Sequence, residues 1–383
     1  MRILIVCDVL GKENNGTTIA AMNLIRFLKS KGHDVRVLCP DQDKRGVEGY
    51  YVVDAFSFGK LLDKYVDKVG VAIAKPQTDV IEKALEGVDF VHIMLPFSLG
   101  QKAVELAKKR NLPVTAGFHC QAENFTAHLK LNGFTLLNHL FYKSLYKKFY
   151  RYVDAIHFPT RFIKNTFESN IKHRTNGYVI SNGVNAGVSK KSANKPEEFK
   201  DKFVILSIGR YAREKSQDTL LKAVKYSKYK DRIQLILAGQ GTKEHAYKKL
   251  AKRLKINPIF KFFGREEIVD VINYCDMYIH PADIELEGIA CLEAIACGKL
   301  VVVSSSKSSA TREFAANEKC IFKKRNPKDL ARVIDYFIED EKAKAVCEQE
   351  YMKHAKLYDQ DACMQKMEDM IMEIYNIAHK KDN

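Results

Sequence analysis

The chain has 383 residues, more than one hydrophobic core ordinarily serves, so its length predicts two domains of ordinary size. Hydrophobic residues make up 46% and charged residues 29%, a balance that excludes extensive disorder. The formal net charge is +16, and residues 101–200 carry most of the excess, with 17 lysines and arginines against 6 aspartates and glutamates. A localised basic surface indicates an anionic partner, which leaves nucleic acid, anionic lipid and a phosphorylated substrate as alternatives.

The cysteines and the N-terminus bear on the compartment. Nine cysteines are scattered from Cys7 to Cys363 and none belongs to a C-x-x-C pair, which is typical of reduced thiols in a cytoplasmic protein. The first apolar run is too short for a signal peptide, because Asp8 interrupts it. No apolar stretch approaches the roughly 20 residues that cross a bilayer. We therefore expect any membrane contact to be peripheral, on the inner face of the membrane.

The first half of the chain alternates between strand and helix patterns. Strands are predicted at 2–7, 34–39, 90–95 and 113–118, and helices at 19–32 and 102–110. Because buried strands joined by helices form parallel sheets, residues 1–185 predict a Rossmann-like α/β domain. Residues 186–202 are polar and poor in large apolar side chains, and we interpret them as a linker.

The alternation restarts after the linker. Strands are predicted at 203–208, 234–238, 259–263, 277–280 and 300–304, and helices at 217–226, 245–254, 268–275 and 292–296. Residues 203–350 therefore predict a second Rossmann-like domain. Apolar residues at helical spacing indicate that residues 351–383 end in a helix packed back on the body. Ligands collect beyond the carboxyl ends of such strands, so the two domains are expected to face each other across one cleft.

A carboxylate, a glycine and a second carboxylate follow one predicted strand of the second half, as Glu285, Gly288 and Glu293. The next helix starts beside them, and backbone N–H groups at a helix start, here those of Ile289 and Ala290, suit a diphosphate. Glu293, about one turn into the helix, could accept hydrogen bonds from ribose hydroxyls. The alternative is that two glutamates simply flank a loop and cap a helix.

Charged residues also follow two other predicted strands. Arg210 and Lys215 could converge on a diphosphate leaving group and stabilise the charge that develops as the glycosidic bond breaks. Basic residues after a strand are, alternatively, only solvated. His119 ends a strand of the first half within a polar cluster, residues 119–124, where a lone histidine can also be structural.

Together these motifs resemble the retaining glycosyltransferases of family 4, which have the GT-B fold of two Rossmann-like domains. Glu285 and Glu293 match the family's E-x7-E pattern, and Arg210 with Lys215 match its G-R-x-x-x-E-K element. The resemblance implies that Arg210 and Lys215 contact the donor phosphates and that Glu285 orients sugar hydroxyls. It also implies that His119 contacts the sugar near the reacting carbon.

Two shorter segments agree with the same family. Gly264 and Arg265 resemble the segment beside the nucleobase, and Asn15 with Gly16 matches the Gly-Gly loop that approaches the donor phosphates. Asparagine tolerates positive φ, but its side chain puts the close backbone approach at position 15 in doubt. Asn185 departs from the aspartate of the family's N-G-V-D element.

The resemblance implies a nucleotide diphosphate sugar as donor, expected to be a UDP-sugar, and no cofactor. The fold typically works without a catalytic metal, and none is expected. In the family's scheme the departing diphosphate deprotonates the incoming hydroxyl. A front-face attack and a short-lived ion pair both remain open as the route to retention.

Residues 134–151 predict an amphipathic helix with a basic face. One arc carries Phe134, Leu137, Phe141, Leu145 and Phe149, and the opposite arc carries Lys143, Lys147, Lys148 and Arg151 beside Leu136 and Leu140. This pattern is typical of a helix lying on anionic lipid, although a core-packed helix with a solvated basic face is the alternative. With the segments around His119 and Glu285, it most resembles family members that glycosylate diacylglycerol or related membrane lipids.

Other functions remain as alternatives. The acceptor could be a soluble glycan or a polysaccharide precursor instead of a lipid. The chain could also be a basic nucleic-acid-binding protein or a sugar-nucleotide binder without turnover. No nucleic-acid-binding module is recognisable, so we expect no nucleic acid partner.

Overall fold

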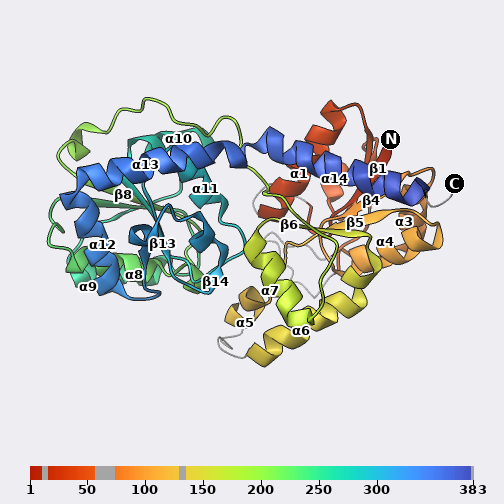
Figure 1. Ribbon diagram of the computed structural model, residues 1–383, viewed down its shortest axis with the longest axis horizontal. Coiled ribbons are helices and arrows are strands. Elements are labelled where there is room, and N and C mark those ends of the chain that lie inside the picture. The colour runs from red at the N-terminus through yellow and green to blue at the C-terminus, as the bar shows by residue number, and fades with distance from the viewer. Residues whose placement is uncertain (11–15, 57–73, 129–134, 381–383) are drawn as a thin grey trace. The chain divides into compact units, whose positions relative to one another are not determined.

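The structure is a computed structural model that describes residues 1–10, 16–56, 74–128 and 135–380. The chain divides into two compact units, each built around its own parallel sheet (Figure 1). The first unit comprises Met1–Ala122, Gly133–Asn182 and Cys363–Asn383, and the second comprises Glu123–Asn132 and Gly183–Ala362. The expected linker, residues 186–202, lies within the second unit, where Phe199 is buried.

Seven parallel strands form the sheet of the first unit, in the order β3-β2-β1-β4-β5-β6-β7. They are β1 (Arg2–Val6), β2 (Asp34–Cys39), β3 (Tyr50–Val52), β4 (Phe90–Ile93), β5 (Val114–Gly117), β6 (Ala155–Phe158) and β7 (Gly177–Val179). The chain adds β2 and β3 on one side of β1 and then returns to add β4 on the other. The strand order therefore reverses between β1 and β4.

Helices cover this sheet. They are α1 (Gly16–Ser30), α3 (Thr78–Leu85), α4 (Ser98–Lys109), α6 (Thr135–Lys148), α7 (Arg161–Ile171) and the C-terminal α14 (Gln360–Lys380). The short α5 (Ala122–His128) follows β5 and belongs, from Glu123 on, to the second unit. α1 and α14 share one core cluster with alternate residues of β1, Ile3 and Ile5, because alternate residues of a strand face the same side. Met367 and Ile371 of α14 are buried there. The end of the chain therefore completes the core of the first unit.

The second unit has a six-stranded parallel sheet in the order β10-β9-β8-β11-β13-β15. Its strands are β8 (Phe203–Ile208), β9 (Ile233–Ala238), β10 (Ile259–Lys261), β11 (Met277–His280), β13 (Val301–Ser304) and β15 (Ile321–Phe322). A separate two-stranded sheet pairs β12 (Ile284–Glu285) with β14 (Ser308–Ser309). The sequence therefore predicted two parallel α/β sheets correctly.

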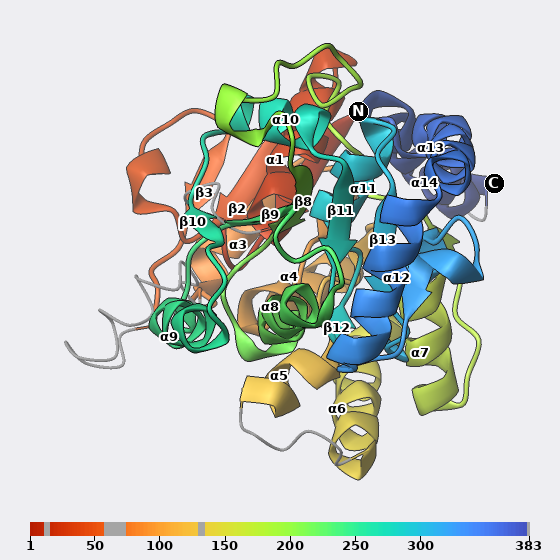
Figure 2. The ribbon, with the colours of Figure 1, turned by 90° about the vertical axis from the view of Figure 1, so that its left-hand side faces the viewer.

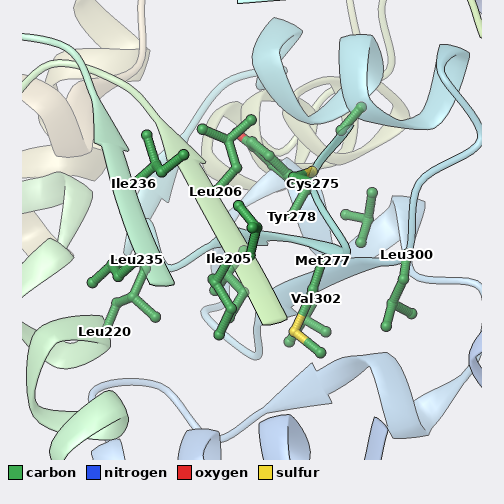
Figure 3. Close-up of a cluster of buried hydrophobic side chains, with 14 of the residues drawn as sticks. Ile205, Leu206, Leu220, Leu235, Ile236, Cys275, Met277, Tyr278, Leu300 and Val302 are labelled. Carbon is green, nitrogen blue, oxygen red and sulfur yellow. The ribbon is translucent and has the colours of Figure 1, made fainter. Parts of the chain in front are cut away.

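Helices cover both faces of the second sheet. One face carries α8 (Gln217–Tyr226), α9 (Glu244–Leu254) and α12 (Pro327–Glu339), and the other carries α10 (Arg265–Tyr274), α11 (Ile289–Ala296) and α13 (Glu341–Ala355) (Figure 1). Figure 2 shows the face that carries α8 and α12, which pack against each other. The core between the layers includes Ile205 of β8, Leu235 of β9 and Met277 of β11, which lie on the side of the sheet that faces Leu220 of α8 (Figure 3).

The helix predicted at 217–226 has the observed bounds, whereas two others in the second unit start later in the prediction than in the structure. α10 begins at Arg265 and α11 at Ile289, each three residues before the predicted start, because Gly264 and Gly288 are the N-cap residues. Apolar periodicity cannot locate such a start, since the first turn of a helix needs no apolar residue. No helix among the described residues is both long enough and apolar enough to span a bilayer.

Candidate active site

The candidate site lies at the carboxyl edge of the second sheet, between β8 and β11. The chain runs from β8 to β9 and β10 on one side and returns through α10 to β11 on the other, so the strand order reverses between β8 and β11. Ligands of doubly wound sheets bind at this position. The segment 209–215 follows β8 and the segment 281–288 follows β11, so the expected donor residues start from neighbouring strand ends.

Lys215, Glu285 and His280 form one buried hydrogen-bonded cluster. The ammonium of Lys215 donates to Oε2 of Glu285, and Nε2 of His280 lies 3.0 Å from the same oxygen. All three side chains are at least three-quarters buried. Two of the residues, Lys215 and Glu285, were predicted from sequence motifs 70 positions apart in the chain, and the fold brings them into direct contact.

This cluster holds Glu285 as a carboxylate. Burial alone would raise the pKa of Glu285, but the charge of Lys215 and the hydrogen bonds from His280 and Lys215 outweigh it and bring the pKa to about 2. The ammonium of Lys215 has three donor hydrogens, and Glu285 uses one of them. Lys215 can therefore contact a bound phosphate without releasing Glu285.

Tyr278 determines how His280 faces Glu285. The phenol oxygen of Tyr278 lies 2.9 Å from Nδ1 of His280 and takes a backbone hydrogen bond from Ile208. Because the phenol accepts from Ile208, its own proton is free to be donated to Nδ1. In the neutral imidazole the remaining proton is then on Nε2, where it is donated to Glu285. Tyr278 and His280 lie on the same side of β11, since side chains two apart in a strand point the same way.

The N-terminus of α11 supplies the expected anion-binding groups. Gly288, the N-cap residue, has φ +84°, and a Cβ at this position would lie 2.6 Å from Cγ2 of Thr311. The carbonyl of Gly288 accepts from Cys291 and Leu292, whereas the N–H groups of Ile289 and Ala290 are in the first turn and have no intrahelical acceptor. Glycine is needed here both for the positive φ and for the close packing of Thr311.

Glu293 lies in the second turn of α11, facing Arg265. Nη1 of Arg265 is 3.6 Å from Oε1 of Glu293, so the two residues expected at the ribose and the nucleobase are brought together. Burial raises the pKa of Glu293, and the charge of Arg265 opposes that shift. Gly264 directly precedes Arg265 as the N-cap of α10, and a side chain there would meet open space.

Arg210 is paired within its own segment. Its Nη2 lies 2.9 Å from Oε1 of Glu214, a carboxylate that is itself buried, while the guanidinium is more than half exposed. Arg210 and Lys215, which both lie on the segment after β8, thus each contact a carboxylate. The sequence predicted their convergence on a diphosphate, which the structure, having no ligand, leaves as a proposal.

The first unit holds the remaining predicted donor and sugar contacts. His119 follows β5, and Nε2 of its ring is buried with no hydrogen-bond partner in the described part of the chain. Burial, with the nearby His157 and His92, keeps the pKa of His119 well below its ordinary value. A Cβ on Gly117 would lie 2.7 Å from Nε2 of His119, so this glycine makes room for the ring. Gly16 is the first residue of α1, whereas Asn15 lies outside the described residues.

The predicted basic helix is α6, and its faces differ partly from the prediction. Leu145 and Phe149 face the core as expected, but Leu137 of the same arc is 40% exposed. Leu136 and Leu140 are exposed by 66% and 53%, so the first half of the outer face is apolar. Lys147 and Lys148 are exposed at its other end, and Lys143 is half-buried. The helix ends at Lys148 instead of the predicted 151, so Phe149 and the exposed Arg151 follow it, and Phe134 lies outside the described residues.

Several site residues were not predicted from the sequence. Tyr278 and His280 are two positions apart in a predicted strand, so their side chains lie on the same face, and Glu285 follows shortly after. This spacing could have identified both residues as part of the site. Asp283 gave no such signal, because its partner Arg325 lies 42 positions away and is brought to it by the tertiary fold. Among the described residues no three His, Cys, Asp or Glu side chains gather in a metal-binding arrangement.

Comparisons with known proteins agree with this architecture. A family described as "Glycosyltransferase Family 4" matches residues 14–187, and one described as "Glycosyl transferases group 1" matches residues 188–354. An alpha-monoglucosyldiacylglycerol synthase of Streptococcus pneumoniae is 24% identical over 319 residues, which cover 79% of this chain and 70% of that protein. One of Acholeplasma laidlawii is 23% identical over 328 residues, which cover 79% of this chain and 80% of that protein.

A solved structure has the same fold. Sucrose-phosphate synthase from Thermosynechococcus elongatus aligns with a TM-score of 0.76 at 15% identity, and the alignment covers 98% of this chain and 100% of that one. At this identity the likeness concerns the fold alone. It confirms the GT-B fold of two Rossmann-like domains that the sequence motifs implied.

Proposed function

The chain belongs to the glycosyltransferases, since two models of that class together match residues 14–354, and we propose that it transfers a hexose from a nucleotide diphosphate sugar, expected to be a UDP-sugar, to a hydroxyl group. The observation that carries this proposal is the common edge of the second sheet, where Lys215 contacts Glu285 and the N-terminus of α11 follows. This edge offers a cation and N–H groups to a diphosphate, and carboxylates to sugar hydroxyls.

In the proposed reaction the bond between the anomeric carbon and the diphosphate breaks, and a bond to the acceptor oxygen forms. The proton of the acceptor hydroxyl passes to the departing diphosphate. Arg210, Lys215 and the N–H groups of α11 hold the negative charge that develops on the leaving group. Glu285 orients sugar hydroxyls, and His119 contacts the sugar near the reacting carbon. Retention of configuration is part of the proposal.

The donor site is tested by turnover of radiolabelled nucleotide sugars, offered with and without lipid acceptors. Lys215→Ala is expected to lower donor use by 100-fold or more, on the order of the loss seen for a group that stabilises transition-state charge. Glu293→Gln is expected to lower donor use by weakening donor binding, because the amide no longer offers two acceptor oxygens to the ribose hydroxyls. Lys249→Ala, which removes an exposed lysine of α9, is the matched control and should keep full activity. If the wild type neither hydrolyses nor transfers sugar from any donor, the enzymatic proposal fails.

We further propose that the acceptor is a membrane glycerolipid such as diacylglycerol. Two observations support this: the names of the two relatives described above, and the outer face of α6. There Leu136 and Leu140 are exposed next to Lys147 and Lys148. Apolar side chains that enter the interface and lysines that meet anionic headgroups are the two parts of a peripheral membrane-binding helix. Such binding would place the cytoplasmic enzyme on the inner face of the membrane.

The membrane contact is tested by sedimentation with vesicles of neutral or partly anionic lipid. Replacing Lys147 and Lys148 together by glutamine should weaken binding to anionic vesicles about 30-fold, since each lysine near such a surface contributes about 1 kcal/mol. Replacing Leu136 and Leu140 by glutamine should weaken binding to both kinds of vesicle. Lys252→Gln with Arg253→Gln, an exposed basic pair on α9, is the control.

Binding that does not distinguish neutral from anionic vesicles, or that high salt leaves unchanged, would contradict the membrane proposal. Transfer to a soluble glycan at a higher rate than to any lipid would assign the enzyme a soluble acceptor instead.

A further inference from the structure

Asp283 is a buried carboxylate that no sequence motif accounts for. Its side chain is 2% exposed, and Oδ2 accepts a hydrogen bond from Nε of Arg325. Oδ1 is buried with no partner in the described part of the chain. Arg325 is therefore the countercharge of a carboxylate that burial would otherwise disfavour.

The backbone of Asp283 connects the two segments that carry the candidate site. Its N–H donates to the carbonyl of Glu214 at 2.8 Å, and Glu214 is the residue before Lys215. Its own carbonyl accepts from Oγ of Ser306 at 2.6 Å. Two residues further along the chain, Glu285 contacts Lys215. Asp283 thus joins the segment after β8 to the segment after β11 at the point where their side chains meet.

Arg325 occupies a backbone position that favours glycine. It lies between β15 and α12 with φ +53°, in the left-handed region that is unfavourable for a residue with a Cβ. An arginine in this conformation destabilises the fold unless its side-chain contacts stabilise the fold by more than the backbone strain costs. The side-chain contact that the structure gives it is the ion pair with Asp283.

We propose that Arg325 and Asp283 are positioning residues that hold Glu285 against Lys215 for the glycosyl transfer. Neither is expected to touch the donor. Arg325 fixes the carboxylate of Asp283, the backbone of Asp283 fixes the two segments, and Glu285 is thereby kept at the cation that meets the leaving diphosphate. The expected effect on kcat rests on the proposed function, whereas the effect on the contact between Glu285 and Lys215 does not.

The test compares Arg325→Gly with Lys255→Gly. Lys255 has φ +54°, is exposed at the end of α9 and has no ion pair among the described residues, so both changes relieve the same backbone conformation and only one removes an ion pair. Arg325→Gly is expected to lower kcat roughly 10- to 100-fold, the cost of misplacing a reacting group, with the KM of the acceptor unchanged. Arg325→Lys should recover most of the loss, and Lys255→Gly should have no effect.

A second measurement does not depend on turnover. The carboxyl carbon of Glu285, assigned with Glu285→Gln and followed by ¹³C NMR, reports the pKa of this residue, which is about 2 in the intact site. In Arg325→Gly the pKa should rise toward its ordinary value as the contact with Lys215 loosens. If no donor is turned over by the wild type, the proposed function fails while this titration still decides the positioning role.

Two results would overturn the inference. In the first, Arg325→Gly lowers the melting temperature of the protein, but it changes neither the pKa of Glu285 nor kcat measured at temperatures where the variant is folded. In the second, Arg325→Gly and Lys255→Gly behave alike in every measurement.

Discussion

The two glutamates of the E-x7-E pattern have opposite electrostatic environments. Glu285 directly contacts Lys215 and His280, and its pKa falls to about 2 despite burial. Nη1 of Arg265 lies 3.6 Å from a carboxylate oxygen of Glu293, and burial raises the pKa of Glu293. A pair of carboxyls whose surroundings move their pKa values apart is typical of groups with different tasks. Glu285 stays ionised through the physiological range, whereas Glu293 is the one whose protonation can follow the medium.

Donor affinity should therefore depend on pH through Glu293. A carboxylate accepts hydrogen bonds from two ribose hydroxyls only when ionised, so binding should weaken as the pH falls toward the raised pKa of Glu293. The measurement is the Kd of a UDP-sugar by calorimetry between pH 8 and pH 5, because a UDP-sugar, unlike UDP, has no terminal phosphate that titrates at about pH 6. Glu293→Gln should bind more weakly at pH 8 and lose this dependence, while Glu244→Gln, on α9, should retain it. An unchanged pH profile in Glu293→Gln would rule out this role.

At the scale of elements, two helices of the second unit start at a glycine beside a residue of the candidate site. Gly264 precedes α10 and Gly288 precedes α11, but the two glycines meet different demands. Gly264 has φ −65°, which any residue adopts, and open space at its Cβ position. Gly288 has a positive φ and lies against Thr311. The start of α11 is therefore determined by one residue that cannot be exchanged.

Gly288→Ala should thus lower the free energy of unfolding by about 2 kcal/mol, the combined cost of a left-handed alanine and a contact that is too short. It should also lower donor affinity, since the N–H groups of α11 would move. Gly264→Ala is the control, and its free energy of unfolding should not decrease. Urea unfolding at constant pH measures both. Equal stability of the two variants would contradict the strain assigned to Gly288.

The same elements show what can be predicted from the sequence. Strands such as β8 and β11 are buried on both faces and give continuous apolar runs, so their positions were predicted closely. β12, β14 and β15 have two residues each, too few for any periodicity. The residues of the Lys215–Glu285 pair lie in motifs, but the Asp283–Arg325 pair spans 42 positions without a local pattern. Contacts between residues so far apart in the chain depend on the order of the strands in the sheet, and the secondary-structure propensities of the residues do not determine that order.

At the scale of the whole molecule, the two units bury different titratable groups. The first unit encloses His92 and His157, whose pKa values burial lowers to about 3 and about 4. It also encloses Asp8, whose pKa burial raises to about 7. In the second unit the pKa of Glu285 is lowered. Buried neutral histidines stabilise the fold above their ordinary pKa near 6.5, and this contribution is lost as the pH falls below it.

Acidification from pH 6.5 to pH 4.5 should therefore weaken the first unit before the second. Each buried histidine costs about 1.4 kcal/mol per pH unit in this range, because the unfolded chain takes up a proton that the folded one refuses. Asp8 acts oppositely, since it is already protonated in the folded state, and offsets one histidine. The contribution of Glu285 is lost only between about pH 4.5 and pH 2.

The measurement is the free energy of unfolding in urea at several pH values. His92→Asn should flatten the decrease between pH 6.5 and pH 4.5, whereas His245→Asn, an exposed histidine of α9, should not. If both variants lose stability with the same slope as the wild type, the decrease has another origin.

The packing of α14 bears on how the chain is made. Met367 and Ile371 of α14 share one core cluster with the apolar residues of α1, and they leave the ribosome long after α1 does. The segment Gly183–Ala362 is synthesised between them, which takes about 10 to 40 s at roughly 5 to 20 residues per second. During that interval the second unit can fold on the emerging chain while α1 still has an uncovered apolar stripe. The cluster around α1 is therefore completed only after the second unit has been translated, and a nascent chain that stalls before Gln360 is a natural client for chaperones that bind apolar surface.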